Sequence, residues 1–174
     1  MDVRITHPSI EEQPRILVVA SNKTNLGVMA HRLVEAGYRI STADNAQDAV
    51  AELHRVTIDL VLAEFDMPRM SGAELARLIR DEVIWRDIPV MLIMGKSDPK
   101  GAVRGYEAGA DDVILKPFHF EVLFARIQRR IERSRTLKRL REDNATLDAR
   151  VVQRAIELGE LRERLAAVEA IASR

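Results

Sequence analysis

The sequence contains no cysteine, few aromatic residues and no long apolar run. Without cysteine, the chain cannot form a disulfide scaffold, a thiol nucleophile or a thiolate-ligated metal site, and it suits a reducing compartment. No apolar stretch approaches the roughly 18 residues that a membrane span needs. The first residues carry acids and a proline where a secretion signal would carry an apolar segment. We therefore expect a cytoplasmic protein without membrane association.

Residue patterns typical of enzymes are also missing. The four histidines, His7, His31, His54 and His119, are scattered, and no two have the helical spacing that a metal site would use. The sequence has no glycine-rich phosphate loop, no GxSxG and no HExxH motif. We predict no enzymatic activity for this chain.

Proline, glycine and charge divide the chain into two parts. All six prolines precede residue 118, and seven of the eight glycines precede residue 110. The net formal charge is zero, yet residues 1–125 carry 14 basic and 19 acidic residues, whereas residues 126–174 carry 13 basic and 8 acidic residues. We predict a disordered lead-in over 1–14, a globular domain over 15–133 and a helical segment over 134–174.

Short apolar runs alternate with helical patterns in the first part. The runs cover residues 15–20, 38–42, 59–63, 89–94 and 112–115. Helical spacing covers 22–36, 46–54, a third segment that starts at Ser71 and ends near Trp85, 100–108, and a fifth segment after Pro117. This alternation predicts an α/β fold with a doubly wound, five-stranded parallel sheet. In such a sheet, functional residues lie beyond the carboxyl ends of the strands.

The segments that follow four of the predicted strands carry ordered motifs. They are ILVVASNKTN from Ile16, LVLAEFDMPRMSG from Leu60, IPVMLIMGKSD from Ile88 and GYEAGADDVILKPF from Gly105. With these motifs the sequence resembles the response-regulator receiver domain of two-component signalling over about residues 15–133. The resemblance implies a flavodoxin-like (βα)5 fold that accepts a phosphoryl group on an aspartate with the help of Mg²⁺. It also implies a docking face for an unknown signalling protein on the fourth helix, fifth strand and fifth helix, from Ala102–Val113 onward.

The positions that would hold magnesium depart from the family pattern. Ala20 and Ser21 stand where the family has an acidic pair. Asp66, two residues beyond the acceptor position, offers one carboxylate in a place where the family uses a backbone carbonyl. Because hard cations prefer carboxylate oxygen, we expect Mg²⁺ binding to be lost or weak, and we expect no other cofactor.

The positions for phosphoryl transfer and switching depart as well. Glu64 occupies the acceptor position, Met94 the position of the switch hydroxyl and Val113 the position of the switch aromatic, while Lys116 is retained. We therefore interpret the domain as a degenerate receiver, a pseudo-receiver that takes no phosphate. The longer side chain of Glu64 can reach toward Lys116. The pair is either a built-in mimic of phosphorylation or only a structural ion pair, and the sequence leaves both open.

The last third has the pattern of a coiled coil. From residue 118 onward there is no proline and a single glycine, Gly159, so we expect the fifth helix to continue to the end of the chain. Asn144 in the seam favours a parallel homodimer, and Arg154 and Gly159 weaken its centre. An antiparallel coil, a different partner helix or a helix folded back on the domain stay open. The predicted seam residues are Leu137, Leu140, Asn144, Leu147, Val151, Leu158, Leu161, Leu165 and Val168, followed by Ala172.

Residues 126–141 are strongly basic, with eight basic residues and one acidic residue. A basic stretch before a zipper is typical of one class of DNA-binding protein. Those proteins also direct asparagine at the bases, and this stretch has none. We favour a solvated joint between domain and coil and expect no nucleic-acid partner.

Two functions fit these observations. In the first, the chain is a phosphorylation-independent interaction module that dimerises through its coil and acts by protein–protein contact. In the second, it is the N-terminal regulatory part of a longer regulator, with a cyclic-di-nucleotide enzyme or an RNA/DNA-binding domain outside this chain. The run LDARVVQRAIELGELRERL resembles the connector found before cyclic-di-nucleotide output domains.

Overall fold

The computed structural model describes residues 13–95 and 99–172, with side chains as far as residue 165 except at Pro99. Five parallel strands form one sheet in the order β2-β1-β3-β4-β5. They are β1 (Arg15–Val19), β2 (Arg39–Ala43), β3 (Leu60–Glu64), β4 (Val90–Met94) and β5 (Asp112–Leu115). The three central strands β1, β3 and β4 are buried almost throughout, as expected for a sheet that is covered on both faces.

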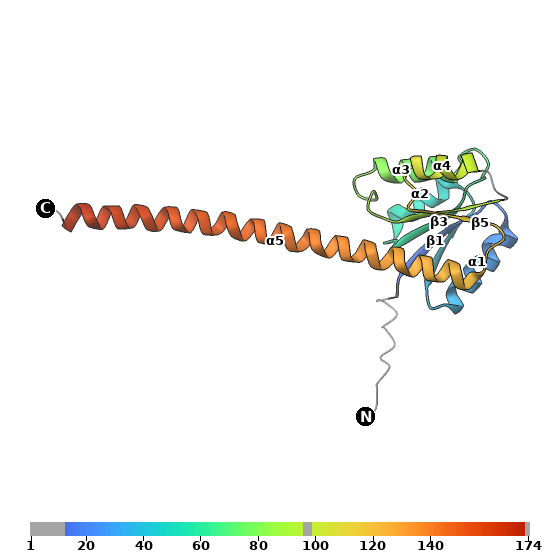
Figure 1. The fold of residues 1–174 in the computed structure, drawn as a ribbon, viewed down its shortest axis with the longest axis horizontal. Helices are drawn as coiled ribbons and strands as arrows, with labels where there is room; N and C mark the ends of the chain where they lie inside the picture. Colours follow the sequence, from blue (N-terminus) through green and yellow to red (C-terminus); the bar gives the residue numbers. More distant parts are fainter. Residues whose placement is uncertain (1–12, 96–98, 173–174) are drawn as a thin grey trace, which may run out of the picture. The chain divides into compact units, whose positions relative to one another are not determined.

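Helices cover both faces of this sheet. The helices are α1 (Lys23–Glu35), α2 (Ala46–Arg55), α3 (Gly72–Asp81), α4 (Pro99–Glu107) and α5 (Phe120–Ala172). In Figure 1, α1 and the first turns of α5 lie on one side of the sheet, and α2, α3 and α4 lie on the other. The predicted doubly wound (βα)5 fold is confirmed, including the long C-terminal helix.

Each face of the sheet has its own apolar core. On the α1/α5 side, Ile16, Leu62 and Met91 pack with Leu33 and Leu123. On the opposite side, the alternate residues of the same strands pack with α2, α3 and α4. These two layers hold the carboxyl ends of β1, β3 and β5 in fixed positions at one edge of the sheet.

A capping box stands at the start of α3, where the sequence predicts a helix to begin at Ser71. The Ser71 hydroxyl accepts a hydrogen bond from the Glu74 N–H at 3.2 Å, and the Glu74 carboxylate accepts one from the Ser71 N–H at 2.7 Å. The Ser71 N–H, and then the Ser71 hydroxyl, donate to the Glu74 carboxylate and hold the pKa of Glu74 below its usual value. The cap fixes where α3 begins relative to the end of β3.

Two expectations need correction. Helix α3 ends at Asp81, so Trp85 lies in the turn that follows the helix and not within it. Trp85 is nevertheless buried, and its ring meets that of His54 edge-on at 4.6 Å. Pro14 falls within the predicted disordered lead-in, but its carbonyl accepts a hydrogen bond from the Arg39 N–H at 2.9 Å and so extends the pairing of β1 with β2. The rest of the lead-in, residues 1–12, lies outside the described residues.

The chain divides into two units, residues 1–134 and 135–174. The first contains the sheet and its helices, and the second is the remaining part of α5. Within residues 13–95 and 99–172, no helix is long and apolar enough to cross a membrane.

The Tyr38 phenol makes the stability of the domain depend on pH in the alkaline range. Burial, and then the negative charge of Glu132, raise the pKa of the Tyr38 phenol above its usual value of 10.0. The neutral phenol therefore stabilises the fold fully below pH 10.0, and this contribution is lost as the pH rises through the raised pKa. We expect urea denaturation midpoints to fall between pH 9 and about pH 11. The fall should be smaller for Tyr38→Phe, and an equal fall in both proteins would contradict this assignment.

Candidate functional site

Glu64 and Lys116 meet at the carboxyl edge of the sheet. Glu64 is the last residue of β3, and Lys116 directly follows β5. The Lys116 ammonium donates to Glu64 Oε1 at 2.7 Å. The Glu64 side chain is 11% exposed and that of Lys116 is 37% exposed. The pair therefore lies at the mouth of the crevice, with its carboxylate in the protein and its ammonium partly in solvent.

Asn25 is a third member of this group that the sequence did not indicate. Its side-chain amide donates to the same Glu64 Oε1 at 3.5 Å, a long hydrogen bond. Asn25 is placed by the start of α1, where the Asn22 side chain accepts a hydrogen bond from the Asn25 N–H at 3.0 Å. The only available signal was that Asn25 falls in a first helical turn at the carboxyl edge of the sheet. The Glu64 carboxylate thus has one donor from α1 and one from the end of β5.

The positions for a magnesium ion carry too few oxygen ligands. Ala20 is buried and has no ligating side chain, while Ser21 and Asp66 are exposed. Among the described residues, no group of three or more histidine and acidic side chains could hold a metal ion. The one acid at the acceptor position, Glu64, is already bound by Lys116. These residues do not fit Mg²⁺, which requires several oxygen ligands in near-octahedral geometry.

The two switch positions are filled by apolar side chains. Met94, the last residue of β4, is 3% exposed, and Val113 on β5 is 8% exposed. Neither side chain has a hydroxyl that could donate a hydrogen bond to a phosphoryl oxygen. Both belong to the core beneath α2, α3 and α4.

An aromatic ring does lie beneath α4, but it comes from the end of β3. A Cβ at Gly105 of α4 would lie 3.3 Å from Val113 Cγ2 and 3.9 Å from Phe65 Cε2. The Arg104 guanidinium stands over the Phe65 ring, 5.7 Å from its centre. Phe65, the residue after the acceptor position, therefore lies against α4. The sequence did not single out this contact, because Phe65 and Arg104 share no local pattern.

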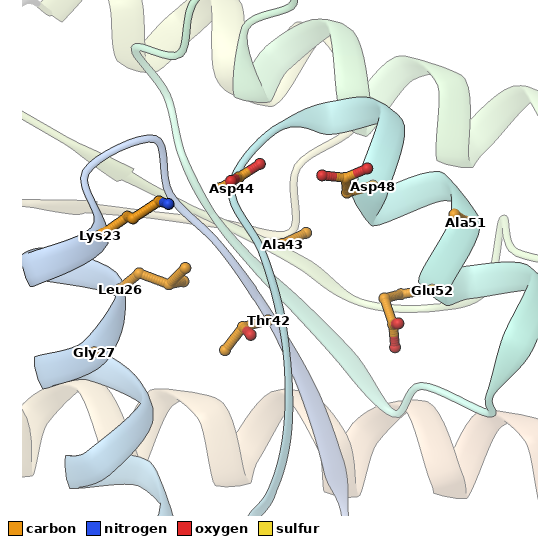
Figure 2. A pocket seen from close by; sticks show the side chains of 9 residues that line it. All are labelled: Lys23, Leu26, Gly27, Thr42, Ala43, Asp44, Asp48, Ala51 and Glu52. Atoms are coloured by element: carbon orange, nitrogen blue, oxygen red, sulfur yellow. The ribbon is translucent and has the colours of Figure 1, made fainter.

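A separate shallow pocket of about 570 Å³ lies between α1, β2 and α2. Figure 2 shows Lys23 and Leu26 of α1 facing Asp48 and Glu52 of α2 across the end of β2. The acids already have hydrogen-bond donors, because the Asn45 amide donates to Asp44 and Asp48 at 2.6 and 2.7 Å, and Arg55 donates to Glu52. This arrangement holds the start of α2 in place and offers no evident ligand site.

Two residues of the basic stretch are tied to the domain. Arg126 lies 3.2 Å from one Asp112 oxygen, and Arg130 lies 3.6 Å from the other. Asp112 is 7% exposed and begins β5, so these contacts fasten the first turns of α5 to the sheet. Contacts with the domain continue to Ser134, whose hydroxyl donates to the Asp87 carbonyl at 3.2 Å, so the expected solvated joint begins only after this residue.

The predicted coil residues lie on α5 with exposed side chains. Leu137, Leu140, Leu147, Val151, Leu158, Leu161 and Leu165 are 46 to 66% exposed, and Asn144 is also exposed. The Val168 side chain lies outside the described part. Large apolar side chains in this number leave a continuous face without cover in the single chain.

Removing Lys116 alone should destabilise the domain more than removing both charges of the Glu64–Lys116 pair. Lys116→Met leaves the Glu64 carboxylate in the crevice without its cation, so we expect a loss of about 1 kcal/mol in the free energy of unfolding, modest because Lys116 is partly exposed. Glu64→Gln in the Lys116→Met background removes the uncompensated charge and should restore most of that loss. Urea denaturation of the wild type, both single variants and the double variant checks this coupling. Additive losses would contradict it.

Comparisons with known proteins agree with this geometry. The model of the response regulator receiver domain family matches residues 16–128. Two solved structures illustrate the likeness in fold. The signal receiver domain of a histidine kinase from Syntrophus aciditrophicus is 35% identical with a TM-score of 0.65, covering 68% of this chain and 90% of that chain. The chemotaxis protein CheY4 of Vibrio cholerae is 26% identical with a TM-score of 0.64, covering 67% of this chain and 98% of that chain.

The curated relatives are longer than this chain. A probable cyclic di-GMP phosphodiesterase of Vibrio cholerae is 34% identical over 172 residues, which are 98% of this chain and 38% of that protein. The phosphate regulon transcriptional regulatory protein PhoB of Klebsiella pneumoniae is 35% identical over 114 residues, which are 66% of this chain and 50% of that protein. The chain therefore spans about half or less of the length of these relatives.

Proposed function

Because this chain belongs to the response regulator receiver family, we propose that it is a degenerate member of that family, a phosphorylation-independent interaction module. It dimerises through the coiled coil of α5 and acts by contact with a signalling partner. No chemical step is assigned to it.

The ion pair of Glu64 and Lys116 carries this proposal. The lysine that would pair with a phosphoryl oxygen already holds a carboxylate at 2.7 Å, and Asn25 adds a second donor to the same oxygen. With Ala20 and Ser21 at the positions of the acidic pair, neither an acceptor aspartate nor a magnesium site is available. The crevice therefore keeps one arrangement whether or not a phosphodonor is present.

Exposure to beryllofluoride and Mg²⁺, or to a small-molecule phosphodonor, tests the proposal. We expect no stoichiometric gain in mass and no widespread amide shifts in the NMR spectrum. A matched control is the triple variant Ala20→Asp, Ser21→Asp, Glu64→Asp, in which three carboxylates occupy the positions of the magnesium site. Its amide signals near these positions should shift when Mg²⁺ is added. A stoichiometric mass gain in the wild-type protein would refute the proposal.

The exposed leucines of α5 support dimerisation. A face of this length with heptad spacing needs a partner helix, and Asn144 favours a parallel pair of identical chains.

Because the chain has no cysteine, one engineered cysteine can report the relative orientation of the two helices. We expect Leu165→Cys, at a seam position, to form an intermolecular disulfide under mild oxidation, because a parallel coil brings the two copies of residue 165 together. Gln153→Cys, outside the seam, should not, and the reverse result would contradict a parallel coil.

The partner's docking face is proposed on α4, β5 and the first turns of α5. Val103 and Tyr106 of α4 and Leu115 of β5 are 54, 51 and 43% exposed. Arg104 on the same helix contacts Phe65, which follows Glu64, so this face is connected to the crevice by direct packing. Alanine substitution of Val103 and Tyr106 should reduce partner binding without altering the dimer.

A second candidate is that the chain is the regulatory part of a longer regulator. It is favoured by the match to the probable cyclic di-GMP phosphodiesterase, which extends through the coil and covers 98% of this chain but 38% of that protein. In this case the coil would pass the state of the receiver to an output domain. Sequencing the natural reading frame beyond Arg174 separates the two candidates, because only the second requires a further domain.

A further inference from the structure

The part of α5 that forms the proposed coil carries a second apolar stripe outside the seam. Val152 and Ile156 are 60 and 53% exposed, and a Cβ at Gly159 would meet nothing within 4 Å. At 100° per residue this stripe lies roughly 150° around the helix from the coil seam, so a two-stranded coil leaves it uncovered. We call this set the outer stripe; its members are Ala145, Ala149, Val152, Ile156 and Gly159.

The outer stripe is complementary to itself when two helices run antiparallel. With Val152 of one copy against Val152 of the other, the larger Ile156 lies near the smaller Ala149 of its neighbour, and the reverse contact forms at the same time. Ala145 then faces Gly159, where two small residues let the helix backbones approach. An interface in which residue i meets j and j meets i is the mark of association between identical chains.

The charges at the two ends of the stripe select the same register. Arg141 borders one end and Glu163 borders the other, and both are exposed. In the antiparallel register centred on Val152, Arg141 faces Glu163, which gives two attractive pairs for two helices. A parallel pairing of the same stripe would place Arg141 against Arg141 and Glu163 against Glu163, which repel each other.

We propose that the outer stripe binds a second copy of this chain, so that coil dimers associate side by side and antiparallel. The inference rests on the proposed dimer and adds an interface to it. Each dimer has two outer stripes on opposite sides, so the association does not close on itself and adds further dimers with rising concentration. Since the stripe spans only about two heptads, the contact is weak and forms on the order of 100 µM rather than at the concentration of the dimer.

Sedimentation velocity of the full chain from about 1 to about 500 µM tests this interface. We expect a dimer at the low end and species larger than a dimer at the high end. Val152→Glu should leave the dimer intact and abolish the larger species. Gln153→Glu, which adds the same charge one residue away and outside the stripe, should leave both unchanged.

Charge reversal tests the register independently. Arg141→Glu or Glu163→Arg alone should weaken the larger species by on the order of tenfold, because each places like charges against each other, and the double variant should restore them. Neither residue faces a charged partner across the parallel seam, so the dimer should persist in all three variants.

The outcomes separate this inference from the proposed function. A dimer that never grows over the whole range, or larger species that persist in Val152→Glu, would overturn the inference alone. A chain that stays monomeric throughout would overturn the proposed dimer as well.

Discussion

Gly72→Ala should be among the most destabilising single substitutions in the domain. A Cβ built at Gly72 would lie within van der Waals overlap of the Glu64 carbonyl oxygen and 3.0 Å from Leu92 Cδ2. The Gly72 N–H also donates to the Phe65 carbonyl at 2.9 Å, so the start of α3 cannot move away without losing this bond. Since the obstacle is backbone at the end of a central strand, we expect a loss of about 3 kcal/mol in the free energy of unfolding.

The same substitution at Gly27 is the matched control. Gly27 lies inside α1, and a Cβ there would meet nothing within 4 Å. Alanine is the better helix former, so Gly27→Ala should stabilise the domain by up to about 1 kcal/mol. Urea denaturation followed by circular dichroism measures both variants. If Gly72→Ala cost no more than an ordinary surface substitution, the close approach of α3 to Glu64 would be wrong.

The close contact between Gly72 and the Glu64 backbone makes the candidate site part of the packed core. The Glu64 side chain is held by Lys116 and Asn25, while its backbone is held against Gly72. The next residue, Phe65, packs beneath α4. A substitution at the acceptor position is therefore expected to affect stability as well as any signalling contact. Experiments on Glu64 need a stability measurement beside the binding measurement.

The fold could be predicted from the sequence because each strand and helix has a local sequence pattern. Buried parallel strands read as short apolar runs, and Ser71 with Glu74 marks the start of α3 within four residues. The positions at the ends of the strands followed from the order of the motifs, which placed Glu64 and Lys116 at the same edge of the sheet. Local patterns missed the end of α3, where the chain leaves the helix at Asp81 before Trp85.

The rest could not be predicted, because it depends on side chains that are far apart along the chain. Asn25 and Glu64 are 39 residues apart, and Arg80 and Asp111 are 31 apart. Such pairs form only once the layers on the two faces of the sheet have fixed their elements. Neither composition nor periodicity distinguishes Arg80 from the exposed Arg77 on the same helix.

Arg80, unlike the exposed Arg77, makes long-range hydrogen bonds on which the stability of the domain depends. Its guanidinium donates to the Gly109, Arg86 and Ile88 carbonyls at 2.8 to 2.9 Å and to the Asp111 carboxylate at 2.6 Å. Asp111 in turn accepts a hydrogen bond from the Val90 N–H at 2.8 Å, at the first residue of β4. One side chain thus joins α3, the turn before β4 and the turn before β5.

Arg80→Ala should therefore lower the free energy of unfolding by about 3 kcal/mol, because it leaves three carbonyl groups and the Asp111 carboxylate without this donor. Arg80→Lys keeps the charge but not the fork of donors, so it should recover only a small part of the loss. Arg77→Ala, three residues earlier and exposed, should change stability by less than about 0.5 kcal/mol. Guanidinium denaturation of the three variants measures these differences. Equal losses for Arg80→Ala and Arg77→Ala would mean that the Arg80 network contributes no more than an ordinary surface charge.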